Sequence, residues 1–312
     1  MHITVEYSLA LRFDDGAPVR AASGIAPFGD GWLVVQDDAT HAAWQRPSGI
    51  SAVRLFPPVD GHDVFSPQAG TKALKPDMEA AVAVGIDTVP AVLTLGSGSS
   101  PRRTRAALVT FGANGPEAAV AELAPLYAAV GDLLDIPAAE VNLEGACVLG
   151  RTLRWFNRGN LAARVPSASV DVDLDLLLAL FDAERADGGL LAEVIASVRD
   201  PRAYDLGTVE GVGLTISDAV TLPDGRILVS TTAEDTPNAI DDGPVVGAAL
   251  AIIEDRAVVD TVALPLFGGQ VAKVEGLALI EATATGATIV AVVDDDDPEL
   301  PSAQHRLVLH WG

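Results

Sequence analysis

The chain has 312 residues, of which 49% are hydrophobic and 5% aromatic, a composition that fits a packed soluble protein. Its formal net charge of −23 argues against a nucleic-acid partner, because binding to a phosphate backbone requires clustered lysine and arginine. No apolar run approaches the roughly 20 residues that a transmembrane helix needs, so we expect no membrane partner.

We expect no secretory leader in residues 1–13. They alternate in polarity and include Glu6 and Arg12, instead of a charged segment followed by an apolar one. The chain contains one cysteine, Cys147, which excludes an internal disulfide framework and agrees with a reducing compartment. We therefore expect a cytoplasmic protein in which Cys147 is a buried, unreactive thiol.

One sequence pattern occurs five times along the chain. Each copy consists of an acidic or small residue, a short apolar strand, a turn, a second strand rich in β-branched residues, and a polar cluster. The copies occupy residues 22–38, 78–105, 143–160, 216–235 and 273–297. Chance recurrence of Glu-Gly dipeptides is the competing explanation. Aligned on one another, the copies place five residues in one register, 56 to 73 residues apart: Ser23, Glu79, Glu144, Ser217 and Glu275.

Repeats of this length, each made of several strands, are typical of β-propeller blades. The last copy is followed by only one further strand, residues 305–310, and the N-terminal residues 3–13 belong to no copy. Pairing these two segments completes the last blade and removes an exposed sheet edge. We therefore predict a single all-β domain over residues 1–312. It is a five-bladed propeller closed by its N-terminal strand, with six blades as the alternative count.

Two segments between the copies depart from strand chemistry. Residues 116–135 are rich in Ala, Leu and Glu and begin with a proline, which favours a helix in the outer part of the second blade. Residues 174–198 are also rich in Leu and Ala, and we interpret them as two outer strands joined by a long turn.

The five aligned residues are the candidate metal ligands, because the first strand of each propeller blade lines the central channel. Three of them, Glu79, Glu144 and Glu275, are carboxylates, and like charges held that close cannot all stay ionised without compensation. A hard divalent cation compensates them. A ligand set made only of oxygen atoms, completed by Ser23 and Ser217, favours Ca²⁺, with Mg²⁺ second. The alternative is that the acids lie at a solvated channel mouth and share protons or water.

The polar clusters after the second strands form an outer circle around the same mouth. Residues 96–105 combine flexible backbone, hydroxyl groups and three arginines, which suit a phosphate or carboxylate ligand, although a solvated turn is the alternative. Arg158 is a further candidate anion contact, or it pairs with one of the many acids. The candidate catalytic residues are Asp37 and Asp38, with His41 beyond them as a less favoured base. The candidate substrate-binding residues are Arg102, Arg103, Arg105, Arg158 and Glu234.

Three stretches, Gly31–Thr40, Leu143–Phe156 and Lys273–Leu277, carry a resemblance to a known family, together with the order Ser, Glu, Glu, Ser, Glu at the aligned positions. They resemble the calcium-activated nucleotidase (apyrase) family, which implies a five-bladed propeller with a central Ca²⁺. Ala39 stands where that family has an arginine. The Glu-Gly-Leu stretch and the aspartate run before Pro298 also resemble bacterial phytase-like and esterase-like propeller proteins of unknown function.

Two functions are compatible with these residues. The first is a metal-dependent hydrolase of a phosphorylated small molecule, in which Ca²⁺ organises the mouth, the arginines hold the anion, and Asp37 or Asp38 activates water. The second is a non-catalytic propeller, in which Ca²⁺ only pins the blades and the mouth binds a ligand or a protein partner. The fold alone does not decide between them.

Overall fold

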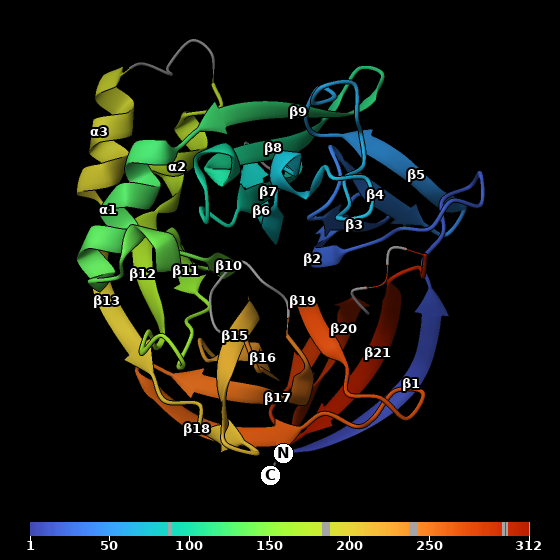
Figure 1. Cartoon of the computed structure of the whole chain (residues 1–312), viewed down its shortest axis with the longest axis vertical. Helices are drawn as coiled ribbons and strands as arrows, with labels where there is room; N and C mark the ends of the chain where they lie inside the picture. The colour runs from blue at the N-terminus through green and yellow to red at the C-terminus, as the bar shows by residue number, and fades with distance from the viewer. Residues whose placement is uncertain (87–88, 183–187, 237–242, 295–296, 298, 312) are drawn as a thin grey trace.

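The computed structural model describes residues 1–86, 89–182, 188–236, 243–294, 297 and 299–311. Five small antiparallel sheets stand around a central axis like the blades of a propeller (Figure 1). The predicted all-β, five-bladed architecture is therefore confirmed. None of the helices that the described residues form has the length and hydropathy of a membrane span.

The blades follow one another in chain order, and the first long strand of each lies innermost. Blade one contains β2 (Ala22–Phe28), β3 (Gly31–Gln36), β4 (His41–Arg46) and β5 (Gly49–Arg54). Blade two contains β6 (Met78–Ile86), β7 (Val89–Gly96), β8 (Arg105–Gly112) and β9 (Gly115–Glu122). Blade three contains β10 (Leu143–Leu149), β11 (Thr152–Asn157), β12 (Ser167–Asp173) and β13 (Arg199–Tyr204).

Blade four contains a short extra strand in addition to four long ones: β14 (Thr208–Val209), β15 (Val212–Thr221), β16 (Ile227–Glu234), β17 (Val245–Glu254) and β18 (Ala257–Ala263). Blade five is built from both ends of the chain: β19 (Lys273–Thr283), β20 (Gly286–Asp294), β21 (Ala303–His310) and β1 (His2–Ala10). The innermost strands contact their neighbours around the whole ring, β2 with β6, β6 with β10, β10 with β15, β15 with β19, and β19 with β2.

The hydrophobic core is divided among the interfaces between neighbouring blades. Each of the five interfaces contains one cluster of buried apolar side chains. A strand in the middle of a blade is therefore covered on both faces, and residues 289–293 of β20 are all buried. This explains why the second strands are continuous apolar runs and do not alternate in polarity.

The five aligned residues share one structural feature, a β-bulge. The pairing register shifts at Ser23, Glu79, Glu144, Ser217 and Glu275, at the same place in each innermost strand. A bulge re-aims the side chain of the extra residue. In blades three and five, a side chain at the next position would collide with the neighbouring strand, because a Cβ on Gly145 would lie 2.8 Å from Cα of Asp218, and one on Gly276 would lie 2.8 Å from Cα of Gly24. The Glu-Gly dipeptides therefore reflect close packing around the channel.

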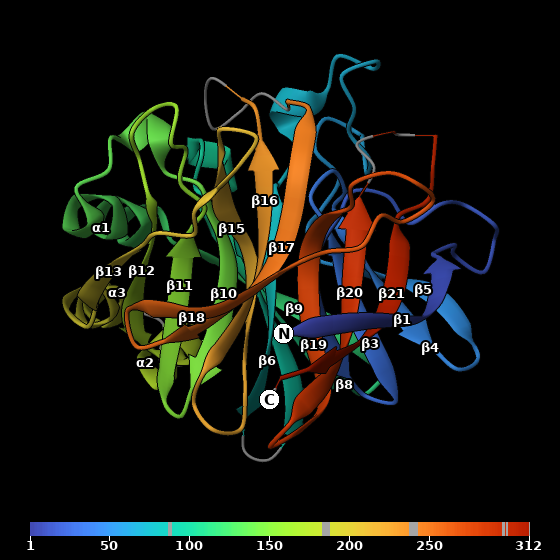
Figure 2. The same ribbon diagram turned by 90° about the horizontal axis from the view of Figure 1, so that it is seen from below.

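The N-terminal strand closes the ring, as predicted. β1 pairs antiparallel with β21 at the outer edge of blade five, and the two chain ends lie close together (Figure 2). The Ser8 hydroxyl lies 2.7 Å from Nδ1 of the buried His305, and Glu6 forms an ion pair with Arg306 at 2.8 Å. The strand ends at Ala10, three residues before the predicted limit, because the Leu11 N–H donates to the carbonyl of Ser302 outside the sheet.

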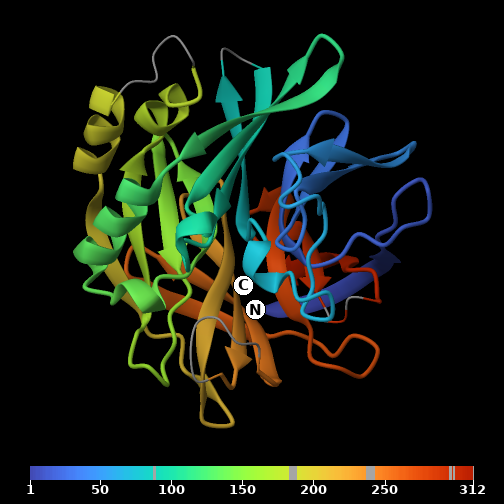
Figure 3. The same ribbon diagram turned by 45° about the horizontal axis from the view of Figure 1, so that its top comes forward.

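Three helices gather on one side of the ring, beside blade three (Figure 3). The helix predicted over residues 116–135 is present only from residue 124: α1 spans Ala124–Leu134, and residues 115–122 form β9. The prediction of two outer strands over residues 174–198 is wrong, because α2 (Leu174–Ala179) and α3 (Gly188–Ala196) occupy this segment. Residues 183–187 lie outside the described part. Leu174 and Leu177, three residues apart on α2, pack with Val194 of α3 into the core between blades two and three.

Candidate functional site

A cavity of about 160 Å³ lies at the mouth of the central channel. Among the described residues, eight acidic and six basic side chains line it, and the six basic ones belong to a total of only 20 lysines and arginines in the chain. All three lysines of the sequence are included. The acidic lining residues are Asp37, Asp38, Asp77, Glu79, Glu144, Glu275, Asp294 and Asp297. The basic lining residues are Arg20, Lys72, Lys75, Arg103, Arg158 and Lys273.

Five of these charged side chains come from two positions on, or just before, an innermost strand. One is the residue at the bulge, and the other lies two residues earlier, which places it on the same face of an extended chain. A third contribution comes from the ends of the second strands, such as Asp294 on β20. The pairs on the innermost strands are Asp77 with Glu79, Asn142 with Glu144, and Lys273 with Glu275.

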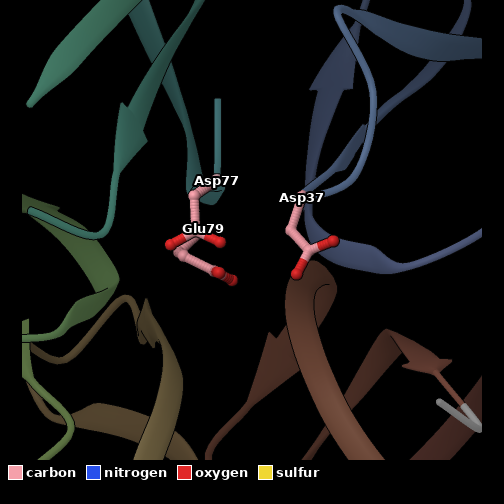
Figure 4. A group of neighbouring side chains, drawn as sticks. All are labelled: Asp37, Asp77 and Glu79. Atoms are coloured by element: carbon pink, nitrogen blue, oxygen red, sulfur yellow. The ribbon is translucent and has the colours of Figure 1, made fainter. Parts of the chain in front are cut away.

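Three carboxylates lie close enough to share one ion. Asp37 follows β3 of blade one and faces Asp77 and Glu79, which belong to the start of blade two (Figure 4). Each offers one oxygen atom, and these three atoms lie within 4.8 Å of one another. We call these residues the acidic triplet. In the described part of the chain, this is the one group of three or more His, Cys, Asp or Glu side chains with such spacing.

The ammonium group of Lys75 lies within the acidic triplet. Nζ of Lys75 forms ion pairs with Oδ2 of Asp37 and, at 2.6 Å, with Oδ1 of Asp77. Asp77 is buried and also accepts hydrogen bonds from the Ser97 hydroxyl and, at 2.9 Å, from Nη1 of Arg103. The protein therefore compensates much of the negative charge at this point with its own cations.

The pKa values in the triplet follow burial and the neighbouring charges. Burial alone would raise the pKa of Asp77, but Lys75 and Arg103 outweigh it and hold this pKa below its usual 3.8. Burial, and then repulsion from Asp77 and Asp37, raise the pKa of Glu79 well above its usual 4.5. Among the described residues, the Glu79 carboxylate forms neither a hydrogen bond nor an ion pair. Unlike Asp37 and Asp77, Glu79 therefore has a carboxylate that is not engaged by a described partner and could bind a ligand.

Asp38 differs from its neighbour Asp37 in its partners. Nη2 of Arg20 lies 2.5 Å from Oδ2 of Asp38, whereas Oδ1 is buried and has no hydrogen-bond partner in the described part of the protein. Burial and repulsion from Asp37 raise the pKa of Asp38 to about 7, against the opposing effect of Arg20. One oxygen of this carboxyl is therefore not used in any hydrogen bond to the described residues.

A second charge network crosses from blade three to blade four. Arg158, after β11, forms an ion pair with Glu144 at 3.2 Å and another with Glu234 at the end of β16. Asn142 also donates to Oε1 of Glu144, at 2.8 Å. Oε2 of Glu144 is buried without a partner among the described residues. Burial raises the pKa of Glu144 to about 8 even though Arg158 lowers it.

Blade five joins this network through a lysine. Nζ of Lys273 lies 3.2 Å from Oε1 of Glu275 and 3.9 Å from Oε2 of Glu234. Glu234 also accepts a hydrogen bond from the backbone N–H of Gly243, at 2.7 Å. Arg158, Glu234 and Lys273 therefore link three successive blades around the channel.

The structure brings four of the five predicted metal ligands to one cavity. Ser23, Glu79, Glu144 and Glu275 line it, and Ser217 does not. The hydroxyl of Ser23 donates to the carbonyl of Met78, and that of Ser217 lies 3.2 Å from Oγ1 of Thr232. The acids with metal-ligand spacing are the triplet, which includes Glu79 but neither Glu144 nor Glu275.

The predicted outer circle is also divided. Asp37, Asp38, Arg103 and Arg158 line the cavity, together with Asp294 and Asp297, whereas residues 295 and 296 lie outside the described part. Arg102 is exposed, and the Arg105 guanidinium lies over the ring of Phe56 at 4.5 Å, so neither lines the cavity. Glu234 and Asp235 line an adjoining cavity of about 370 Å³, which shares Asn142 and Arg158 with the first. His41 lines neither cavity and contacts Phe13.

Six charged or amide side chains of the lining were not predicted: Arg20, Lys72, Lys75, Asp77, Asn142 and Lys273. A period of two from the bulge position identifies three of them, Asp77, Asn142 and Lys273. Lys75 lies in the connection between blades one and two, where no periodic signal exists. The restriction of all lysines to residues 72, 75 and 273 is the other signal in the sequence.

Comparisons with known proteins identify a family but no activity. Residues 71–298 match a family of unknown function (DUF6910). A search of curated proteins finds no match. Similar solved structures include a mannose phosphorylase, MPT-4 from Leishmania mexicana. It is 13% identical and has a TM-score of 0.46, and the match covers 99% of this chain and 89% of that one.

Two further structures match at similar levels. For a luciferin-regenerating enzyme, the identity is 13%, the TM-score is 0.42, and the match covers 95% of this chain and 80% of that one. For a protein of unknown function from Dyadobacter fermentans, the identity is 9%, the TM-score is 0.42, and the match covers 99% of both chains. At these scores and identities the neighbours carry no argument about activity.

Proposed function

This chain belongs to the DUF6910 family of unknown function, and we propose that its central cavity binds Ca²⁺ and hydrolyses a small phosphorylated molecule. The observation that carries this proposal is the acidic triplet, Asp37, Asp77 and Glu79, inside a cavity that is also rich in basic side chains.

The triplet fits a hard cation of the size of Ca²⁺. Two oxygen atoms on opposite sides of Ca²⁺ lie about 4.8 Å apart, because each bond is about 2.4 Å long. The three triplet oxygens lie within this span. Glu144 also lines this cavity, and its buried Oε2 has no hydrogen-bond partner among the described residues. Asp37, Asp77 and Glu79 would hold the ion. They replace the predicted ring of five ligands, because Ser217 does not line the cavity.

The basic side chains support an anionic substrate beside the cation. Arg20 and Lys72 line the cavity from the segments before and after blade one, and Arg158 and Lys273 line it from blades three and five. Ammonium and guanidinium groups form charge-assisted hydrogen bonds with phosphate. A bound Ca²⁺ would supply charge neutralisation and Lewis-acid polarisation at the phosphoryl oxygens. The exposed Arg102 and the stacked Arg105 have no part in this proposal.

Asp38 is the general base in this proposal. Its Oδ1 faces no partner within the described protein, and the residue lines the cavity beside the triplet. Arg20 holds the other oxygen and so orients the carboxyl group. A carboxylate in this position accepts a proton from an attacking water molecule.

The experiment is a hydrolysis assay with generic phosphate esters and nucleoside diphosphates, with Ca²⁺ or with a chelator. We expect phosphate release that requires Ca²⁺ and falls by roughly tenfold or more in Asp77→Asn, because the cation loses a charged ligand. Asp175→Asn, which alters a half-exposed acid far from the cavity, is the matched control. Equal phosphate release from all three proteins would assign the activity to a contaminant.

A second function, a non-catalytic propeller pinned by the cation, has its own supporting observation. The ion pairs at the mouth cross blade boundaries, as Lys75 with Asp37 and Arg158 with Glu234 do. A mouth of this kind holds blades together whether or not it performs chemistry. A rise in melting temperature with Ca²⁺, without phosphate release from any substrate, would favour this function.

A further inference from the structure

We propose that Lys75 is a built-in competitor of the cation: its ammonium group occupies the place between Asp37 and Asp77 that Ca²⁺ would take, and it leaves when the cation binds. This inference rests on the proposed cation site and adds to it a residue that controls cation affinity.

The position of Lys75 carries the inference. Its Nζ contacts one carboxylate from blade one and, at 2.6 Å, another from the start of blade two. The side chain is 12% exposed, so solvent does little to weaken these ion pairs. Lys75 follows a single 3₁₀ turn, η1 (Lys72–Leu74), and precedes Pro76, in the connection between the two blades. The backbone therefore delivers one ammonium group to the point where the triplet converges.

Lys75 and a divalent cation exclude each other at this point. Both would contact Oδ2 of Asp37 and Oδ1 of Asp77, and two positive charges on shared oxygens repel strongly in a buried site. Ca²⁺ also takes six to eight oxygen ligands, and an ammonium group among them blocks part of that shell. When Lys75 leaves, Asp77 keeps its hydrogen bonds from Arg103 and Ser97. Both of these reach Oδ2, whereas Lys75 contacts Oδ1.

As a consequence, the site is stable without the cation, and the position of its positive charges changes when the cation binds. Without Ca²⁺, Lys75 compensates the triplet and the fold does not depend on a metal. With Ca²⁺, the displaced ammonium group stays tethered at the mouth, near the lysine at position 72, and adds a positive charge for an anionic ligand. Cation binding and anion binding then strengthen each other, and the coupling is reciprocal.

The experiment is a calorimetric titration of the full-length protein with CaCl₂, in wild type and in two variants. Lys75→Met removes the competing charge and keeps much of the side-chain volume, so Ca²⁺ should bind roughly tenfold tighter or more than in wild type. Arg102→Met removes a positive charge from an exposed residue that does not line the cavity, so its affinity should stay close to that of wild type.

The possible outcomes separate this inference from the proposed function. Tighter binding in Lys75→Met alone supports competition. Equal affinity in wild type and Lys75→Met overturns the competition and leaves the cation site intact. No binding in any protein overturns the cation site and the competition with it. If Lys75→Met folds only with Ca²⁺ present, that dependence supports the inference. In that case the Ca²⁺ affinity is measured in Lys75→Gln, whose side chain is neutral and still donates a hydrogen bond to a carboxylate.

Discussion

Deletion of residues 1–10 is expected to lower the melting temperature by roughly 10 °C or more and to reduce the soluble yield sharply. These residues supply β1, whose pairing with β21 runs from His2 with His310 to Ala10 with Ala303. Each backbone hydrogen bond contributes about 0.5–1.5 kcal/mol net, and the whole ladder is lost. The deletion also exposes the edge of β21, which can pair with other chains. Thermal melting and the fraction of soluble protein measure the two effects.

A matched control separates the strand from its side chains. β1 is exposed on its outer face, where Val5 is 37% and Leu9 45% exposed. Val5→Thr keeps the backbone ladder and a β-branched side chain, so it should change the free energy of unfolding by no more than about 0.5 kcal/mol. A truncated protein that melts at the wild-type temperature would contradict the closure of the ring by β1.

Arg158→Met is expected to destabilise the protein by about 3–5 kcal/mol, because it removes the cation that pairs with the buried Glu144 and one of the two that pair with Glu234. The Arg158 side chain is 14% exposed and forms ion pairs with Glu144 of blade three and Glu234 of blade four. Burial already raises the pKa of Glu144, and Arg158 is the main opposing influence. Chemical denaturation measures the free energy of unfolding directly.

Arg151→Met is the matched control for this prediction. Arg151 belongs to the same blade and pairs with Asp175, but the two side chains are 81% and 50% exposed. Exposed pairs contribute at most about 1 kcal/mol, so this variant should unfold almost like wild type. Equal destabilisation in the two variants would contradict a special role for the buried network at the channel.

The number of blades and the closing strand could be predicted because both follow from the innermost strands. Each innermost strand contains a bulge, and at four of the five bulges the next residue is a small one, Gly or Ala, where two backbones meet. Gly145 and Gly276 are such residues, since a Cβ at either would lie 2.8 Å from a neighbouring Cα. The bulge occurs once per blade, so the sequence repeats a recognisable pattern at each innermost strand. The helices α2 and α3 leave none, because short apolar segments such as residues 174–179 suit a strand or a helix equally.

The site was most predictable on the innermost strands and directly after the second strands. Glu79, Glu144 and Glu275 reach the cavity because the bulge dictates their direction. Arg102 and Arg103 lie in a 3₁₀ turn, η2 (Pro101–Arg103), and Arg105 follows it. Such a turn has about three residues per turn, so neighbouring side chains point in different directions. Arg103 turns inward to Asp77 while Arg102 stays exposed. Lys75 reaches the triplet through tertiary packing of a loop, which no local pattern records.

The central claim is that the acidic triplet binds Ca²⁺, and an anomalous difference map from crystals grown with CaCl₂ tests it most directly. We expect a peak about 2.3–2.6 Å from the carboxylate oxygens of Asp37, Asp77 and Glu79, with Lys75 turned away from them. A map without a peak in the cavity, with Nζ of Lys75 still between Asp37 and Asp77 at saturating CaCl₂, would contradict it.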